Sequence, residues 1–308
     1  YMIEYHIDGF ILNPQIAPME AIYADPILKK TKIMIHRIDF QTVMRRFLKG
    51  DEGMVEGVMH WLRHISKKDG IFNCITNQNG FTLYDLVSYD RKHNEANGEN
   101  NQDGPEYNYS WNCGAEGMTR KKAITSLREQ QMKNAFFLLL LAQGTPCILA
   151  GDEFGNTQKG NNNVYCQDNS TGWTDWSRLE QKKEFHDFVK KLIAVRKRYP
   201  VFWPKEEMCG MNQARCGIPD VSYHGESAWR VPSEVFSRQL GVFYSGAAAG
   251  GEDCFIAYNM HWIEHSFALP ALPREKKWYK IASTKEGILD EAECLGNQRT
   301  VVLKERMI

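Results

Sequence analysis

The chain of 308 residues is 43% hydrophobic and 12% aromatic, and its 38 Lys and Arg residues balance 38 Asp and Glu residues. A chain of this length and composition can bury a sizeable core and is expected to form two globular domains. Zero net charge gives no field that would attract nucleic acid or an anionic membrane, so neither is expected as a partner. An uncharged partner such as a polysaccharide is at least as compatible with this charge balance as nucleic acid or an anionic membrane.

Eight cysteines are spread along the chain without a Cys-x-x-Cys pair, which argues against a zinc site or a redox couple. We interpret them as reduced thiols of a cytoplasmic protein, and we expect neither a metal nor a cofactor. The longest apolar run, residues 135–142, is far below the ~20 residues that cross a bilayer, and no signal peptide opens the chain. The first residue is Tyr1, which leaves open whether an N-terminal portion is missing.

The first 200 residues predict strands and helices in alternation. Apolar runs rich in β-branched residues predict buried strands at residues 6–12 and 32–36, with a short helical stretch at 18–30 between them. Apolar residues recur at helical spacing around 55–62 and 185–193. A long helix is predicted over residues 120–143, and it is followed by Gly144 and a buried strand at 145–150. This order is typical of parallel α/β architecture.

From about Phe202 onward, short strands broken by Gly and Pro replace this pattern, for example at residues 241–244, 254–259 and 300–304. Such a pattern predicts an antiparallel β domain. We therefore expect an α/β domain over residues 1–200 and a β-sandwich over residues 201–308.

Five sequence strings lie between residues 80 and 170: GFTLYDLVSY at 80–89, KHNEANGENN at 92–101, SWNCGAEG at 110–117, GTPCILAGDEFG at 144–155 and GNNNVYCQDN at 160–169. Together they resemble the second half of the catalytic barrel of bacterial glycogen-debranching enzymes and isoamylases, in the α-amylase (glycoside hydrolase 13) superfamily. Weaker similarity continues through residues 220–225 and 257–262 into a C-terminal β-sandwich of that family.

The resemblance implies a (β/α)₈ barrel that hydrolyses α-1,6 branch linkages of glucans with retention. Residues 6–13, 32–36, 73–79 and 145–151 then resemble strands four, five, seven and eight, whereas strands one to three have no counterpart. Half a barrel would leave open sheet edges, so either the chain is a fragment or the fold is completed in another way.

The family's catalytic carboxylates can be looked for position by position. Its strand-four motif Asp-Gly-Phe-Arg-Phe-Asp corresponds to residues 8–13 here, which places Asn13 at the nucleophile and Ile11 at the supporting arginine. The acid/base glutamate of strand five corresponds to His36, and the His-Asp pair after strand seven corresponds to Gln78 and Asn79. Retaining hydrolysis needs two carboxyl groups, and all three family carboxylates are replaced. We therefore expect no glycosidase activity by the family mechanism.

Two alternatives remain open for this interpretation. The register could be shifted by a residue or two, although the flanking Asp8-Gly9-Phe10 and Gly80-Phe81 anchor two of the three positions. Asp25 or Asp39 could act as substitutes, but both lie away from the predicted strand ends. The chain also has only a few residues between His36 and a helix predicted near Val43, where the family has a longer insertion with a further strand.

Residues that suit sugar binding are kept in the last of these strings and just after it. Aromatic faces pack on sugar C–H surfaces, and amides or carboxylates meet hydroxyl pairs. On this basis we predict a glucan-binding set, of which Gln78 comes from the strand-seven loop: Gln78, Asn162, Asn163, Tyr165, Asp168, Trp173 and Trp176. The alternative is a structured polar loop with anchored tryptophans. In residues 92–103, the side chains of His93, Asn94, Glu95 and Asn97 are interpreted as loop scaffolding, with ligand contacts as the alternative. Asp152 and Glu153 are interpreted as either site residues or a cap of the next turn.

Three hypotheses for function follow. The first is a non-catalytic protein that binds an α-glucan or maltooligosaccharide, or regulates its use, beside an active debranching-enzyme paralogue. The second is an active debranching hydrolase with displaced catalytic residues. The third is an assembly subunit without a ligand.

Overall fold

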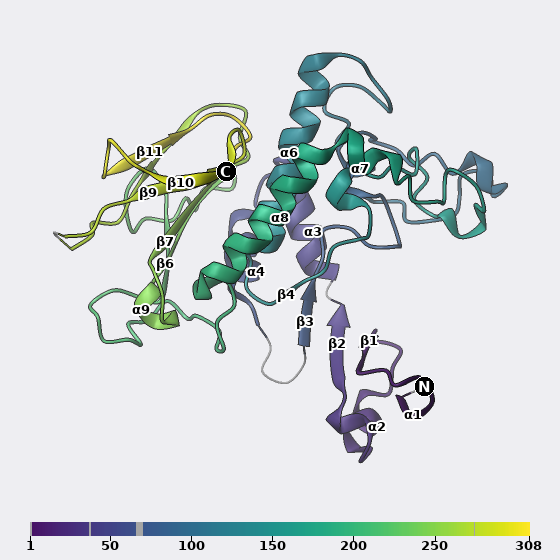
Figure 1. Ribbon diagram of the computed structural model, residues 1–308, viewed down its shortest axis with the longest axis horizontal. Coiled ribbons are helices and arrows are strands. Elements are labelled where there is room, and N and C mark those ends of the chain that lie inside the picture. Colours follow the sequence, from purple (N-terminus) through teal and green to yellow (C-terminus); the bar gives the residue numbers. More distant parts are fainter. Residues whose placement is uncertain (1, 37, 66–69, 274) are drawn as a thin grey trace.

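The computed structural model describes residues 2–36, 38–65, 70–273 and 275–308 (Figure 1), without the side chains of residues 36 and 71. One part of the chain is built on a parallel sheet and helices, and the other on antiparallel strands. Both strand directions were predicted. The division into domains at residue 200 stays a prediction.

The parallel sheet has four strands in sequence order: β1 (Gly9–Leu12), β2 (Lys32–His36), β3 (Gly70–Asn73) and β4 (Thr145–Pro146). Gly9 pairs with Lys32, Met34 with Gly70 and Phe72 with Thr145. Strand β2 lies directly beside β3, so no further strand separates them. β1 and β4 form the two edges of this sheet, and the described residues contain no pairing that closes it into a barrel.

Three predicted boundaries were wrong. Strand β3 ends at Asn73, whereas residues 73–79 were expected to form it. The polar residues after it form a loop in which Asn77 Oδ1 accepts the Asn79 amide at 2.8 Å, a turn that competes with strand pairing. Strand β4 stops at Pro146, well before residue 150, although the Cys147 amide still donates to the carbonyl of Asn73. The helix expected near Val43 is α3 (Ile38–Lys49), which begins directly after β2.

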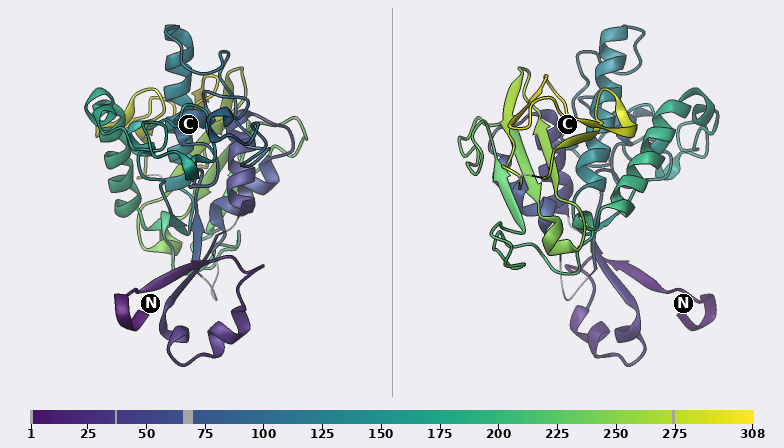
Figure 2. Two further views of the ribbon diagram at one scale, coloured as in Figure 1. Left: turned by 90° about the vertical axis from the view of Figure 1, so that its right-hand side faces the viewer. Right: turned by 60° about the vertical axis from the view of Figure 1, so that its left-hand side comes forward.

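Residues 2–31 form an arm that extends away from the long helices α3, α6 and α8 (Figures 1 and 2). It contains α1 (Met2–Tyr5), β1, α2 (Met19–Ala24) and the 3₁₀ turn η1 (Leu28–Lys30). The helical stretch predicted at 18–30 is interrupted because Asp25 Oδ1 accepts the amides of Ile27 and Leu28.

Helix α6 (Lys122–Leu140) lies at the centre of the molecule and is slightly shorter than predicted. Residues 134–142 are all buried, because α6 packs between α3 and α8 (Lys183–Arg198). Phe136 and Phe137 meet Phe185 and Phe188 edge to face, with ring centroids 5.8 and 5.4 Å apart. The remaining helical elements are short: α4 (Val55–Arg63), α5 (Leu83–Leu86), α7 (Ser177–Gln181), α9 (Gly246–Ala249), η2 (Glu95–Asn97), η3 (Asp152–Phe154), η4 (Val164–Cys166) and η5 (Pro200–Phe202).

The antiparallel part contains one three-stranded sheet, β5 (Val221–His224), β6 (Gln239–Tyr244) and β7 (Cys254–Asn259). Two hydrogen-bonded pairs accompany it: β8 (His265–Ala268) with β11 (Thr300–Leu303), and β9 (Tyr279–Ser283) with β10 (Gly287–Cys294). Residues of β6 and β7 belong to the same buried hydrophobic cluster as α6. The guanidinium of Arg306 donates to the carbonyl of Lys49 at 2.6 Å, and its carbonyl accepts from Asn134. The core is therefore continuous across the two parts.

Candidate functional site

Asn13 and Asn79, two of the three positions predicted to correspond to the family's catalytic residues, are exposed and lie in turns. Asn13 follows β1 on the N-terminal arm, and its Oδ1 accepts the amide of Gln15 at 3.0 Å. Gln78 and Asn79 are exposed in the loop after β3. His36 ends β2, but its side chain lies outside the part that the structure describes. Asn13 and Asn79 are therefore turn residues. Their side-chain amides cannot take the role of a carboxylate nucleophile or a carboxylic acid.

The loop that carries Gln78 and Asn79 is anchored at both ends by buried charged groups. Arg45 Nε donates to the carbonyl of Ile75 at 2.6 Å on the N-terminal side of the loop. On the C-terminal side, Asp152 Oδ1 accepts the Leu83 amide at 2.8 Å, while its other oxygen receives the Thr76 hydroxyl. Burial lowers the pKa of Arg45 to about 10 and raises the pKa of Asp152 to about 7.

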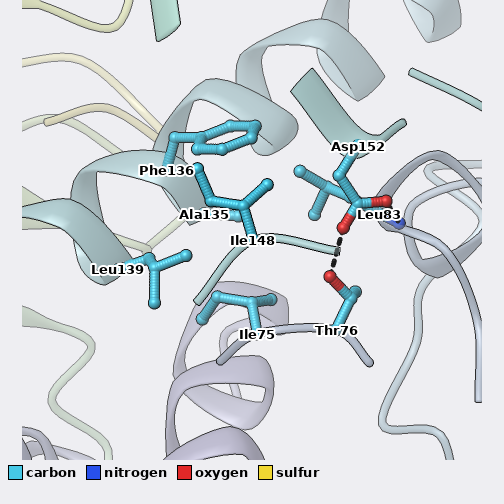
Figure 3. Close-up of a pocket in the computed structure, with 8 residues that line it drawn as sticks. All are labelled: Ile75, Thr76, Leu83, Ala135, Phe136, Leu139, Ile148 and Asp152. Carbon is cyan, nitrogen blue, oxygen red and sulfur yellow. Dashed lines mark hydrogen bonds between the residues drawn. The ribbon is translucent and has the colours of Figure 1, made fainter. Parts of the chain in front are cut away.

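A small cavity of about 10 Å³ adjoins this anchor, and Figure 3 shows Thr76 and Asp152 facing each other beside apolar side chains of the loop and of α6. The space suffices for about one water molecule. The cavity is therefore far too small for a sugar ring. Asp152 was interpreted as either a site residue or a cap, and its contacts are internal.

Asparagine side chains cross-link two loops that are far apart in sequence. Asn162 is 1% exposed; its side chain donates to the carbonyl of Pro105 and accepts from Asn94 Nδ2 at 2.8 Å. Asn163 Nδ2 donates to Asp103 Oδ2 at 2.9 Å, and the same carboxylate oxygen accepts from Asn97 at 2.7 Å. These bonds lower the pKa of Asp103. The hydrogen-bonding groups of Asn162 are used within the protein, so they are poorly placed to contact a ligand.

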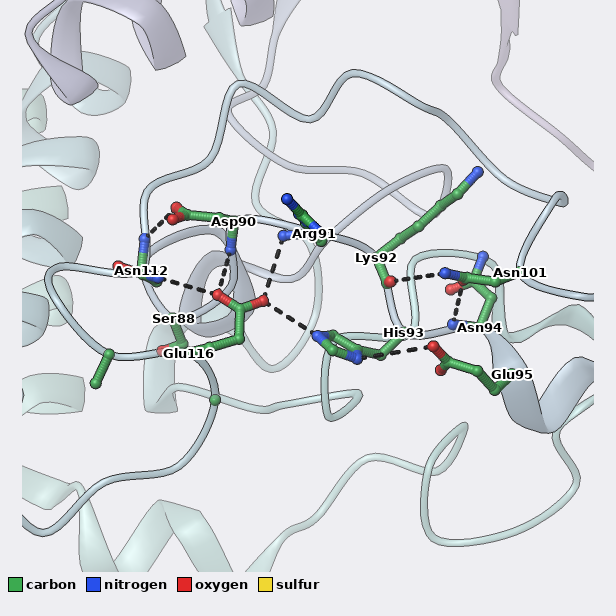
Figure 4. Close-up of polar contacts among 12 residues, drawn as sticks. Ser88, Asp90, Arg91, Lys92, His93, Asn94, Glu95, Asn101, Asn112 and Glu116 are labelled. Atoms are coloured by element: carbon green, nitrogen blue, oxygen red, sulfur yellow. Dashed lines mark hydrogen bonds and ion pairs between the residues drawn. The ribbon is translucent and has the colours of Figure 1, made fainter.

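A second polar cluster holds the other end of residues 92–103 (Figure 4). The carboxylate of Glu116 accepts the amides of Asp90 and Arg91, and it meets His93 Nε2 at 3.1 Å and Asn112 Nδ2 at 3.0 Å. These hydrogen bonds lower the pKa of Glu116 although its partial burial acts in the opposite direction. The scaffolding role predicted for this segment accords with these contacts.

Three aromatic residues of the predicted glucan-binding set are exposed. Tyr165 is 71% exposed, Trp173 59% and Trp176 69%. Trp173 Nε1 donates to Asp168 Oδ1 at 3.0 Å, which joins two members of the set. Trp176 lies at the start of α7 and packs on the buried ring of Phe154, with centroids 5.5 Å apart. Exposed rings with a fixed orientation are suited to stacking on a flat ligand face.

Sequence reasoning did not single out several ionisable residues that organise this region. Asp85 accepts the Thr157 hydroxyl and the Gln158 amide, and burial raises its pKa to about 6. The buried Arg45 and the exposed Glu116 also stand in ordinary helical or loop sequence. Among the described residues, no group of His, Cys, Asp and Glu side chains is arranged to hold a metal ion, and no helix is long and apolar enough to span a bilayer.

Comparison with known proteins places this arrangement in a family. Residues 80–229 match the model of the α-amylase catalytic domain. The Glycogen operon protein GlgX homolog of Mycobacterium tuberculosis is 40% identical over 71% of this chain and 32% of its own length. Isoamylase 3, chloroplastic, of Oryza sativa is 33% identical over 91% of this chain and 40% of its own. The chain is a homologue of the isoamylase-type debranching enzymes of the α-amylase family.

Solved structures agree with this family at the level of the fold. A pullulanase from Bacillus acidopullulyticus covers 99% of the chain with a TM-score of 0.66 at 16% identity, and the chain spans 38% of that protein. A pullulanase mutant from Paenibacillus barengoltzii, solved with maltotetraose, gives a TM-score of 0.61. This isoamylase-type homologue therefore spans about a third to a half of the length of these proteins.

Proposed function

We propose that this chain is a non-catalytic α-glucan-binding homologue of the isoamylase-type debranching enzymes. The observation that carries the proposal is the set of exposed aromatic residues Tyr165, Trp173 and Trp176 on a segment held by internal amide hydrogen bonds. Related pullulanases have been solved with maltooligosaccharides, which supports an α-glucan as the ligand class. We call these three residues with Asp168 the aromatic platform.

The replaced carboxylates support the non-catalytic part of the proposal. Retaining glycosidases need a nucleophile and an acid/base about 5–5.5 Å apart. Asn13 and Asn79 supply amides in exposed turns, and His36 occupies the third position. Asp25 is a weak substitute because its Oδ1 accepts two backbone amides in the arm. Binding requires only a shaped aromatic and polar surface, so it can persist where bond cleavage does not.

Isothermal titration with maltoheptaose tests the proposal. Trp173→Ala and Trp176→Ala should each weaken binding by about five- to 150-fold, because loss of one stacked aromatic ring costs roughly 1–3 kcal/mol and each 1.4 kcal/mol is a factor of ten. Trp262→Ala is the matched control, since Trp262 is 57% exposed on the antiparallel part. Asn13→Ala should bind normally.

The outcomes separate the three hypotheses. If Asn13→Ala destroys affinity while both platform variants bind normally, the ligand site lies at the former catalytic positions and the platform is wrongly assigned. If the unmodified chain binds no maltooligosaccharide, the assembly-subunit hypothesis replaces this one. Co-sedimentation with amylopectin, with and without an active isoamylase, tests the proposed partnership with an active debranching enzyme.

A further inference from the structure

A six-residue turn connects the loop after β3 with the aromatic platform. Residues 151–156 follow β4 and contain η3. The turn is closed on itself: the carbonyl of Gly151 accepts the Asn156 amide at 2.8 Å, and Glu153 Oε2 accepts the Gly151 amide at 2.8 Å. Gly151 has φ +100°, and a Cβ there would lie 2.7 Å from Asn156 Cβ. The turn should therefore move as one unit.

One side of this turn supports Trp176. Phe154 is 1% exposed and its ring lies behind the indole, with an interplanar angle of 35°. Asn156 Oδ1 accepts the amide of Asp175 at 3.0 Å, which fixes the residue that precedes Trp176. Both contacts come from the turn, so the position of Trp176 depends on where the turn lies.

The other side of the turn is held by Asp152. Its carboxyl group is 2% exposed and bonds the Leu83 amide and the Thr76 hydroxyl, as Figure 3 shows for Thr76. These two partners flank the loop that carries Gln78 and Asn79. Helix α8 also packs against η3, so the turn has a second neighbour that contributes apolar contact. Among the described residues of the turn, Asp152 is the one that supplies side-chain hydrogen bonds to the two ends of the loop after β3.

We propose that Asp152 is a positioning residue for the aromatic platform, acting on Trp176 through the turn 151–156 and Phe154. The inference rests on the proposed function only where it names a glucan as the ligand. The structural link from Asp152 to Trp176 is independent of the proposed function. The buried carboxyl group of Asp152 would then affect ligand binding by holding Trp176 in place, without contacting the ligand itself.

The test follows the indole N–H signal of Trp176 by ¹H–¹⁵N NMR without ligand, assigned by its loss in Trp176→Phe. Asp152→Ala should shift this signal, and Asp152→Asn should restore most of it because an amide can still accept from Leu83 and donate to Thr76. Thr76→Val removes one of the two partners and should give a smaller shift in the same direction. Asp220→Asn is the distant control, since Asp220 is also buried but holds amides of the antiparallel part.

Titration with maltoheptaose then completes the test. Asp152→Ala should weaken binding at least threefold, and Asp152→Asn should stay within twofold of the unmodified chain. A Trp176 signal that is unchanged in both Asp152→Ala and Thr76→Val overturns the inference. So does a shift of equal size in Asp220→Asn. If the signal moves as expected while the unmodified chain binds no glucan, the positioning role stands and the proposed function fails.

Discussion

The hydroxyl of Thr157 donates a hydrogen bond to the fully buried carboxyl group of Asp85. This contact joins the segment before the Asn161–Asn163 amides to the start of α5, and the Gln158 amide adds a second bond at 2.7 Å. The hydrogen bonds favour the charged form of Asp85, but desolvation dominates and its pKa lies at about 6.

This pKa predicts how stability depends on pH. Between the unfolded pKa of about 3.8 and the folded pKa of about 6, the folded state binds more protons than the unfolded state. The contribution of Asp85 to the free energy of unfolding therefore falls as pH rises through this window, by up to roughly 3 kcal/mol. Urea unfolding at pH 4, 5, 6 and 7 should show that the free energy of unfolding of Asp85→Asn increases relative to that of the unmodified chain as pH rises. Asp25→Asn is the control with the opposite sign, because hydrogen bonds lower that pKa. Identical slopes for Asp85→Asn and the unmodified chain would contradict the prediction.

Arg196 predicts a large local effect on stability. Its guanidinium donates to the carbonyls of Leu140, Ala142 and Gly144 at 2.6, 2.6 and 2.5 Å, just where α6 ends. Arg196→Met should lower the free energy of unfolding by roughly 3–5 kcal/mol, because buried carbonyls lose charge-assisted partners. Lys197→Met changes an exposed residue of the same helix and should stay within about 0.5 kcal/mol. Guanidinium unfolding measures both, and equal losses would show that the bonds contribute little.

Two glycines with nearly the same backbone conformation separate strain from steric overlap. Gly98 has φ +78° and open space around a Cβ, whereas Gly160 has φ +80° and a Cβ there would lie 2.7 Å from the Tyr89 ring. Gly98→Ala should cost about 1 kcal/mol from backbone strain. Gly160→Ala should cost roughly 1–3 kcal/mol more, because Tyr89 and His93 must move. Thermal unfolding compares the pair. Equal losses of stability in the two variants would mean that the Tyr89 ring moves aside at no energetic cost.

The proposed replacement of the catalytic carboxylates at Asn13, His36 and Asn79 predicts that the chain releases no reducing sugar from amylopectin, glycogen or pullulan above a heat-treated control. Loss of nucleophile and acid together removes the interactions that are made only in the transition state. A reducing-end assay with an active isoamylase as positive control measures this. Turnover that Asp39→Asn or Asp152→Asn abolishes would reveal displaced catalytic residues.

The sequence predicted the direction of the strands better than their ends. Periodicity and β-branched runs locate β1 and β2. The string at 80–89 follows a loop, so it aligns Gln78 and Asn79 with the family motif but does not show that β3 ends at Asn73. The competing interaction is local, since Asn77 bonds the amide of Asn79. Direct pairing of β2 with β3 also depends on tertiary contacts that periodicity does not contain.

The candidate site shows the same limit. Composition indicated that residues 160–176 carry amides and aromatic rings, but it could not tell which amides are used internally. Asn162 bonds Asn94 across 68 residues, and that contact exists only in the folded chain. The buried groups of Arg45 and Asp85 were not found for a related reason: their sequence positions look ordinary, and only burial distinguishes them.

The bond between Arg306 and the carbonyl of Lys49 has a consequence for how the chain folds during synthesis. The two residues are 257 positions apart, and the side chain of Asn134 donates a hydrogen bond to the carbonyl of the same arginine. Helix α3 and the buried face of α6 therefore emerge from the ribosome long before the segment that completes their polar contacts. Until β6 and β7 have also emerged, the apolar face of α6 that packs with them in the core remains uncovered.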